Sequence, residues 1–120
     1  MPTKEEVTKF LEAFRTQVMA QGYYAAKTPK NQAGLLALGI TRQHRRQVIL
    51  SLTCDDYSSG PSPDIAYPGE PVWVFGAVVE GTEVYIKLKL PPEGKPTCIS
   101  FHPAERRIEY PFRDPEEGRR

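Results

Sequence analysis

Tyrosine and lysine side chains alternate with apolar ones between residues 84 and 90. Tyr85, Lys87 and Lys89 occupy the odd positions, and each even position carries valine, isoleucine or leucine. Successive side chains of a β-strand point to opposite faces of the sheet. The pattern therefore predicts a strand with one buried face, and with a phenol and two ammonium groups on the other face. Ammonium groups can hold phosphate, and a phenol can donate a hydrogen bond or stack on a base.

A second alternating segment, residues 97–101, ends beside a histidine. Burial of its apolar residues sends Ser100 and His102 to the same surface as the phenol and the ammonium groups. An imidazole titrates near pH ~6.5, so it can serve as acid or base. Such a set suits phosphodiester cleavage, in which a base deprotonates an RNA 2′-hydroxyl, a cation stabilises the oxyanion and an acid protonates the leaving oxygen. The predicted catalytic residues are His102, Tyr85 and Lys87, with Lys89 as a substrate-binding residue.

Further cations and one aromatic residue extend this hypothesis. Arg106 and Arg107 follow the histidine closely enough to reach the same face, and Tyr57 is a large aromatic that can stack on a base. The alternative interpretation is a solvated sheet face, on which the two arginines are balanced by nearby glutamates. A separate basic run, from Arg42 to Arg46, falls on a predicted helix. It is either a solvated face or a contact for RNA phosphates or for an acidic partner.

The first half of the chain has helical signals. Thr3 and Glu6 have the spacing of a capping box, which predicts a helix that ends before Gly22. Thr28 followed by proline predicts the start of a second helix, and Thr41 predicts the start of a third that ends near residue 52.

The second half switches to extended segments, at residues 71–75, 82–90 and 97–101, with a candidate fourth strand at 107–112. Helices followed by an antiparallel meander predict an α+β domain, with N-terminal helices packed on a C-terminal antiparallel β-sheet. We expect one domain over residues 1–113 and a charged, frayed tail over residues 114–120.

Composition narrows the class of protein. The formal net charge of +1 excludes a uniformly basic coat, so any polyanion site must come from local clustering. Cys54 and Cys98 have no zinc or redox spacing, and no cluster of metal ligands stands out, so neither a metal nor a cofactor is expected. Without a signal peptide or an apolar run of about 18 residues, we expect a cytoplasmic protein with no membrane contact and with reduced thiols.

Four segments together resemble the motility quorum-sensing regulator (MqsR) toxin family. One is similar to the end of a helix and the following loop in that family, and three are similar to its strand motifs. Their order and spacing agree as well, so the resemblance covers residues 5 to about 112. A Tyr-Ile-Lys-Leu-Lys strand followed by Ile-Ser-Phe-His is a specific combination, whereas either piece alone is weak. The segments are Val48–Thr53 with Asp55–Tyr57, Val72–Gly76, Glu83–Leu90 and Ile99–Glu105.

The resemblance implies a RelE-like fold and the toxin of a type II toxin–antitoxin system, a metal-independent endoribonuclease that cuts messenger RNA to inhibit translation and growth. It also implies a cognate antitoxin as partner. By motif match, Tyr85 takes the place of the family's active-site tyrosine. His102 stands where the best-studied branch has a catalytic lysine. Where that branch has a glutamine after its tryptophan, this sequence has Val74. The position of that branch's loop lysine falls near Ser59, so the loop lysine is missing here. A histidine in place of the catalytic lysine suggests proton transfer rather than pure charge stabilisation. Lys87 or Lys89 would then supply the missing cation.

Two alternatives stay open. One is a non-catalytic module that binds a protein with the same sheet face, and the other is a nuclease that cuts only on the ribosome. A neighbouring antitoxin gene would favour both toxin interpretations over the binding module. Cutting of naked RNA by the purified protein would separate ribosome-independent from ribosome-dependent action.

Overall fold

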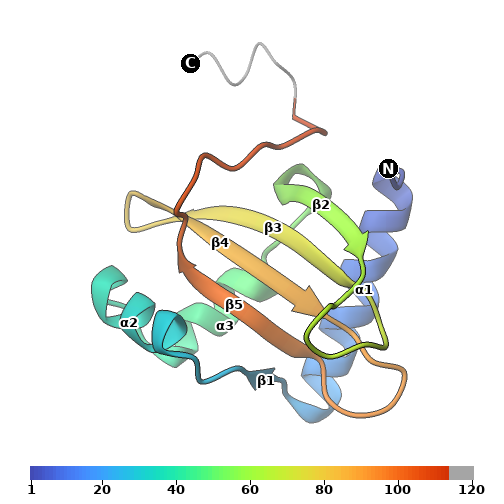
Figure 1. Ribbon diagram of the computed structural model, residues 1–120, viewed down its shortest axis with the longest axis horizontal. Coiled ribbons are helices and arrows are strands. Elements are labelled where there is room, and N and C mark those ends of the chain that lie inside the picture. Colours follow the sequence, from blue (N-terminus) through green and yellow to red (C-terminus); the bar gives the residue numbers. More distant parts are fainter. Residues whose placement is uncertain (114–120) are drawn as a thin grey trace.

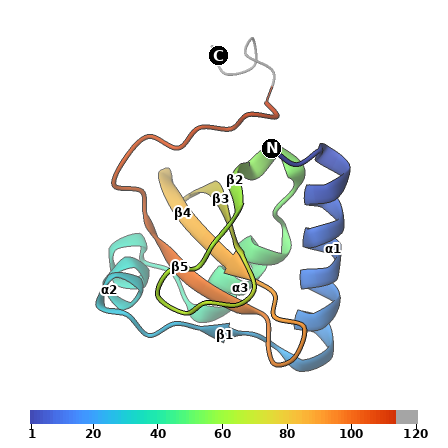
Figure 2. The ribbon, with the colours of Figure 1, turned by 45° about the vertical axis from the view of Figure 1, so that its right-hand side comes forward.

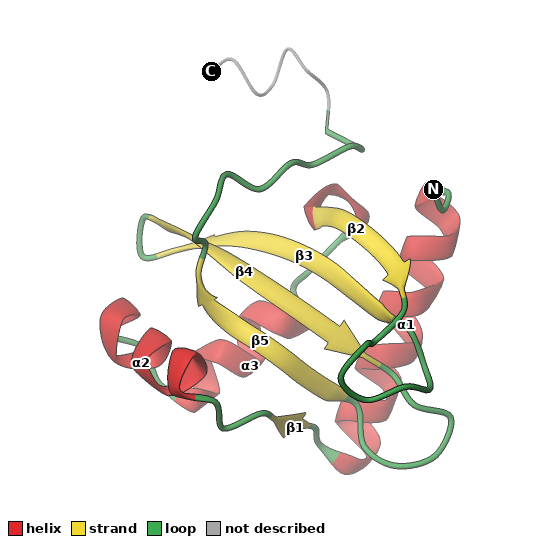
Figure 3. Cartoon of the chain, viewed as in Figure 1, coloured by secondary structure: helices red, strands yellow, loops and turns green. Residues whose placement is uncertain are grey.

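The computed structural model describes residues 1–113, and the predicted tail at residues 114–120 lies outside this part. Three helices come first and the main strands follow, which confirms the predicted α+β class (Figure 1, Figure 3). The helices are α1 (Lys4–Gln21), α2 (Pro29–Leu38) and α3 (Arg42–Leu50), with a 3₁₀ turn at Cys54–Asp56. The strands are β1 (Tyr24–Ala25), β2 (Tyr57–Ser62), β3 (Val72–Val79), β4 (Thr82–Lys89) and β5 (Thr97–Pro103).

Each helix begins at the threonine that the sequence predicts. Thr3 and Glu6 form a reciprocal capping box with two bonds of 3.1 Å. Thr28 caps α2 with proline at its first position, and Thr41 caps α3. The side-chain oxygens satisfy amide groups that have no partner inside a helix. Gly22, with φ 76°, ends α1 in a conformation that most residues avoid.

The five strands form one sheet in the order β1-β5-β4-β3-β2. β2 to β5 are antiparallel, as predicted, but β1 pairs parallel to β5, so the complete sheet is mixed. The predicted alternation on β4 is confirmed, because its even-numbered residues from 84 to 88 are fully buried. They face the core, while α1 and α3 lie behind the sheet in Figure 1. The core includes Val7, Leu11, Phe14 and Val18 of α1, together with Phe75, Val84, Ile86, Leu88 and Phe101 of the sheet.

The outer edge of β5 is closed partly by backbone and partly by one side chain. β1 covers Thr97 and Cys98. Beyond it, the amide of Asn31 donates to the Ile99 carbonyl at 2.9 Å and accepts from the Phe101 amide at 2.9 Å. Asn31 is only 4% exposed, and its side chain takes the place of a strand. This contact holds the start of α2 beside β5 (Figure 2).

The segment after β5, residues 104–113, returns past the sheet and is called the C-terminal strap (Figure 1). It contains no strand, so the predicted fourth strand at 107–112 is wrong. Its backbone is held by side-chain bonds instead of a ladder: the Ile108 amide donates to Glu83 Oε1 at 3.1 Å, and the Tyr110 hydroxyl donates to Oε2 at 2.8 Å. Gly76 permits this docking, since a Cβ there would lie 2.9 Å from Ile108 Cδ1.

Candidate active site

A groove of about 960 Å³ lies on the outer face of the sheet, away from α1 and α3. β2 to β5 form its floor, and the start of α2 and the C-terminal strap form its sides. All three predicted catalytic residues and both predicted arginines line this groove. The lining relevant to chemistry is Ser58, Ser59, Val74, Tyr85, Lys87, Ser100, His102, Arg106 and Arg107.

Tyr85 and His102 form the central pair of the groove. They are direct cross-strand partners on β4 and β5, and their rings stack with centroids 5.6 Å apart at 25°. His102 Nδ1 lies 3.0 Å from the Pro103 carbonyl oxygen, which leaves Nε2 as the nitrogen without a protein contact in the described chain. Both side chains are half-buried. The pair therefore brings an imidazole and a phenol within reach of one substrate group.

Lys87 supplies a cation next to this pair. It lies on the same face of β4 as Tyr85, with Ser100 opposite it on β5 and Val74 opposite it on β3. No carboxylate in residues 1–113 forms an ion pair with it. Its ammonium group is thus available to the groove, where a phosphate or an oxyanion can take the place of a missing counter-ion.

Helix α2 approaches unusually close to the back of His102. An added Cβ at Gly34 would lie 3.0 Å from His102 Cα and Cβ, and 3.1 Å from the Phe101 carbonyl oxygen. Only glycine accommodates this approach without displacing β5. Gly34 and Asn31 therefore fix the strand that carries the imidazole, one by its small size and the other by its two hydrogen bonds.

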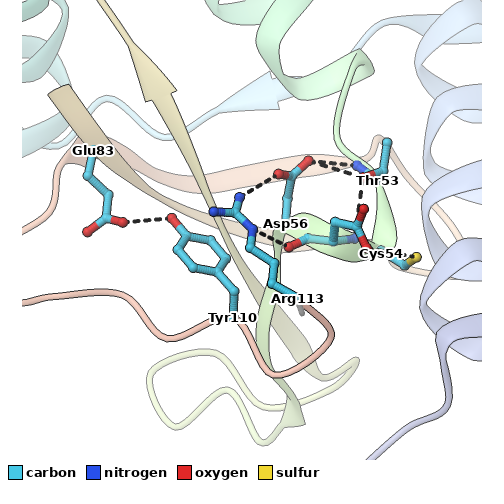
Figure 4. A network of polar contacts seen from close by, with 7 residues as sticks. Thr53, Cys54, Asp56, Glu83, Tyr110 and Arg113 are labelled. Atoms are coloured by element: carbon cyan, nitrogen blue, oxygen red, sulfur yellow. Dashed lines mark hydrogen bonds and ion pairs between the residues drawn. The ribbon is translucent and has the colours of Figure 1, made fainter. Parts of the chain in front are cut away.

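The C-terminal strap closes the other side of the groove, and Figure 4 shows the contacts that hold it at Tyr110 and at Arg113. Glu83 holds Tyr110, and Arg113 donates to Asp56 at 3.2 Å and to the Asp55 carbonyl at 3.0 Å. The Arg113 guanidinium also lies 3.7 Å from the ring centroid of Tyr110. Burial and the hydrogen bond to Glu83 raise the pKa of the Tyr110 hydroxyl, so it remains a donor. These anchors position Arg106 and Arg107 along the groove wall.

Two predicted substrate-binding residues lie elsewhere. Tyr57 is 2% exposed and packs against core aromatics, with its hydroxyl bonded to the Gly60 carbonyl. It has no free face for a base, so that prediction is wrong. Lys89 does not line the groove. Its ammonium group donates to Asp64 and to the Tyr67 carbonyl, each at 2.9 Å. Its charge is already neutralised by protein, so it is not free for phosphate.

Asn31, Ser58 and Ser59 also line the groove and were not predicted as site residues. Asn31 is a polar position inside a helix, but nothing in the local pattern shows that β5 lies beside it. The two serines fall in β2, whose sequence Tyr-Ser-Ser-Gly-Pro-Ser has no apolar alternation. The three positions at which the sequence departs from the expected pattern, Val74, Ser59 and His102, all line the groove.

Comparison with known proteins agrees with this combination of α+β fold and polar groove. A family model described as motility quorum-sensing regulator, toxin of MqsA, matches residues 8–103. The match includes every groove residue of the sheet and ends before the C-terminal strap. No curated protein and no solved structure matches the chain significantly. The chain belongs to the MqsR toxin family, and it is therefore the toxin of a toxin–antitoxin pair. The RelE-like relationship stays a prediction.

Residues 1–113 contain neither a helix suited to span a membrane nor a cluster of metal ligands. No helix in this range is both long and apolar enough to cross a membrane. Within the same range, no three histidine, cysteine or acidic side chains gather as metal ligands. The two cysteines are unpaired, and burial raises the pKa of the Cys98 thiol to about 12. At neutral pH Cys98 is a protonated core residue and not a nucleophile.

Proposed function

We propose that the groove is the active site of an endoribonuclease that cuts messenger RNA by attack of the substrate's own 2′-hydroxyl. The observation that carries the proposal is the contact between Tyr85 and His102 beside an uncompensated lysine. In-line attack needs a proton acceptor, a proton donor and positive charge at the phosphate. All three are side chains of this groove, so the proposed reaction requires no metal and no cofactor.

The geometry supports separate roles for the groove residues. His102 acts through Nε2, since Nδ1 faces the Pro103 carbonyl. It takes the proton of the attacking 2′-hydroxyl or gives a proton to the leaving 5′-oxygen, and the Tyr85 hydroxyl serves the other transfer. Lys87 stabilises the charge that develops on the phosphate, and Tyr85 donates a hydrogen bond while its ring orients the imidazole. Arg106 and Arg107, on the exposed strap, bind neighbouring phosphates. A cognate antitoxin would then neutralise the toxin by controlling access to RNA.

The nucleophile is tested with an RNA that carries one 2′-deoxy nucleotide immediately 5′ of a mapped cut. Cleavage at that bond should stop while cleavage at other sites continues, because the attacking hydroxyl is missing and the phosphates are unchanged. The products at unmodified sites should carry a 2′,3′-cyclic phosphate and a free 5′-hydroxyl. Continued cutting at the deoxy site, or loss of all activity with a chelator, would show that water or metal-bound hydroxide attacks. Naked RNA as substrate also tests independence from the ribosome.

A further inference from the structure

A second hollow, of about 590 Å³, adjoins the groove along the segment that leads into α2. Lys27 lines this hollow, Thr28 to Lys30 line the groove, and Asn31 lines both. The remaining walls come from β1, from α2 and from α3. We call this hollow the basic cleft, defined by Tyr23, Tyr24, Lys27, Arg42, Arg45 and Arg46.

The basic cleft concentrates positive charge in a protein whose net charge is only +1. Four cations line it and no carboxylate does. None of the four forms an ion pair within residues 1–113. The groove differs, because Glu105 and Glu109 are part of its lining. A cluster of cations without counter-ions is electrostatically costly unless an anion occupies it.

Neighbouring side chains hold two of these arginines in place. Arg45 Nε donates to the Tyr23 hydroxyl at 3.1 Å, and its guanidinium lies 5.9 Å from that ring's centroid. Arg46 is placed by a contact of 3.5 Å to Met19 Sδ. Beside them, Tyr24 exposes 51% of its surface on the two-residue strand β1. The cleft therefore offers fixed cations and an exposed aromatic ring at one location.

We infer that the basic cleft binds the flank of a single-stranded RNA whose scissile phosphate occupies the groove; this rests on the proposed function. Cations that follow a backbone, together with aromatic rings that accept bases, are the usual elements of single-strand binding. The basic cleft and the groove share Asn31 in their linings, so they lie on either side of the segment that leads into α2, close enough for one polynucleotide to reach both. An acidic protein segment would use the cations but would need neither the exposed ring nor the neighbouring groove.

The test compares RNAs of about five and about twelve nucleotides, extended at one end or at the other. All carry 2′-O-methyl groups, so binding is measured by fluorescence anisotropy without cleavage. The wild-type protein should gain affinity from an extension at one end only, because the cleft adjoins one side of the groove. Lys27→Gln/Arg42→Gln should lose that gain. Lys4→Gln/Lys9→Gln, which removes the same charge from exposed positions of α1, should keep it.

Salt dependence makes the comparison sharper. Each phosphate contact to a single strand contributes about −0.7 to the slope of log affinity against log salt concentration, so affinity falls as salt is added. Removal of two contacts should therefore reduce the loss of affinity between about 50 and about 200 mM salt by about sevenfold for the long RNA. An extension that gives no gain, or a gain lost equally in the α1 control, overturns the inference. So does a double variant that loses only antitoxin binding, which would assign the cleft to an acidic protein.

Cleavage of unmodified RNA is measured separately, so the two proposals can fail independently. Cutting without any length effect would retain the nuclease and reject the RNA-binding cleft. A one-sided length effect on binding, without cutting, would reject the nuclease and retain a single-strand binding path across the β5 edge.

Discussion

Lys87 and Lys89 lie two positions apart on the same face of β4, yet their surroundings differ. Lys87 faces the groove, whereas Lys89 is held between Asp64 and the Tyr67 carbonyl. Lys87→Ala should therefore reduce the cleavage rate with little loss of stability. Lys89→Ala should lower the free energy of unfolding while keeping the cleavage rate of the folded protein. Single-turnover kinetics and urea unfolding of both variants check this pair, and the opposite assignment of effects would refute it.

The Lys89–Asp64 contact also predicts a pH dependence of stability. The side-chain hydrogen bond from Lys89, followed by the backbone bond from Tyr67, lowers the pKa of Asp64 below its ordinary value. A carboxyl whose pKa is lower in the folded state stabilises the fold above its unfolded pKa of about 3.9, and this contribution disappears as the pH falls through the folded pKa. Asp64→Asn should thus be less stable than wild type at neutral pH, with the difference vanishing in acid. Denaturant titrations from neutral pH to about pH 2 test this sign.

At the scale of elements, α2 acts on the site through its close approach to β5. Gly34→Ala gains helix propensity, worth up to about 1 kcal/mol, but forces overlap with rigid atoms of His102 and Phe101, worth about 1–3 kcal/mol. We expect net destabilisation and a lower cleavage rate. Ala37→Gly, at an exposed position of the same helix, should cost only the propensity term and leave the rate unchanged. Thermal unfolding and single-turnover rates decide between these outcomes.

The C-terminal strap depends on Glu83 in a comparable way. Glu83→Ala leaves the Ile108 amide and the Tyr110 hydroxyl without their acceptor, which costs about 1–3 kcal/mol per buried group left unpaired. The strap should loosen, so trypsin should cut after Arg106 and Arg107 more quickly. KM for RNA should rise more than kcat falls, because the role proposed for these arginines is to bind phosphates and not to react. Tyr110→Phe removes one bond and should show a smaller effect of the same kind.

The sequence predicts those elements whose signals are local. Threonine caps define the helix starts, and the period of two on β4 defines both its burial and the outward side of Tyr85. β2 and the strap have no such signal, since β2 is held by its pairing with β3 and the strap is held by contacts with the distant residues Glu83 and Asp56. For the same reason the sequence could not show that Tyr57 is buried or that Lys89 has a partner.

At the scale of the whole molecule, family membership predicts the effect on a cell. Expression without the antitoxin should arrest growth of a bacterial host. His102→Ala should relieve the arrest, because loss of a general acid or base slows the reaction by about 10²- to 10⁴-fold. Viable counts after induction, with protein levels matched by immunoblot and folding checked by circular dichroism, measure this. Equal toxicity of the two proteins would remove His102 from the mechanism.

The Asn31 contact has a consequence for self-association. An exposed sheet edge can template pairing with another chain, and a molecule with two open edges can extend into a fibre. Here the β5 edge is occupied by a two-residue strand and a side-chain amide, so within residues 1–113 only β2 presents a long edge. If two copies paired through their β2 edges, the described residues would leave no second long edge for a third copy. Asn31→Leu would leave the Ile99 carbonyl and the Phe101 amide without their partner and so remove part of the protection of this edge.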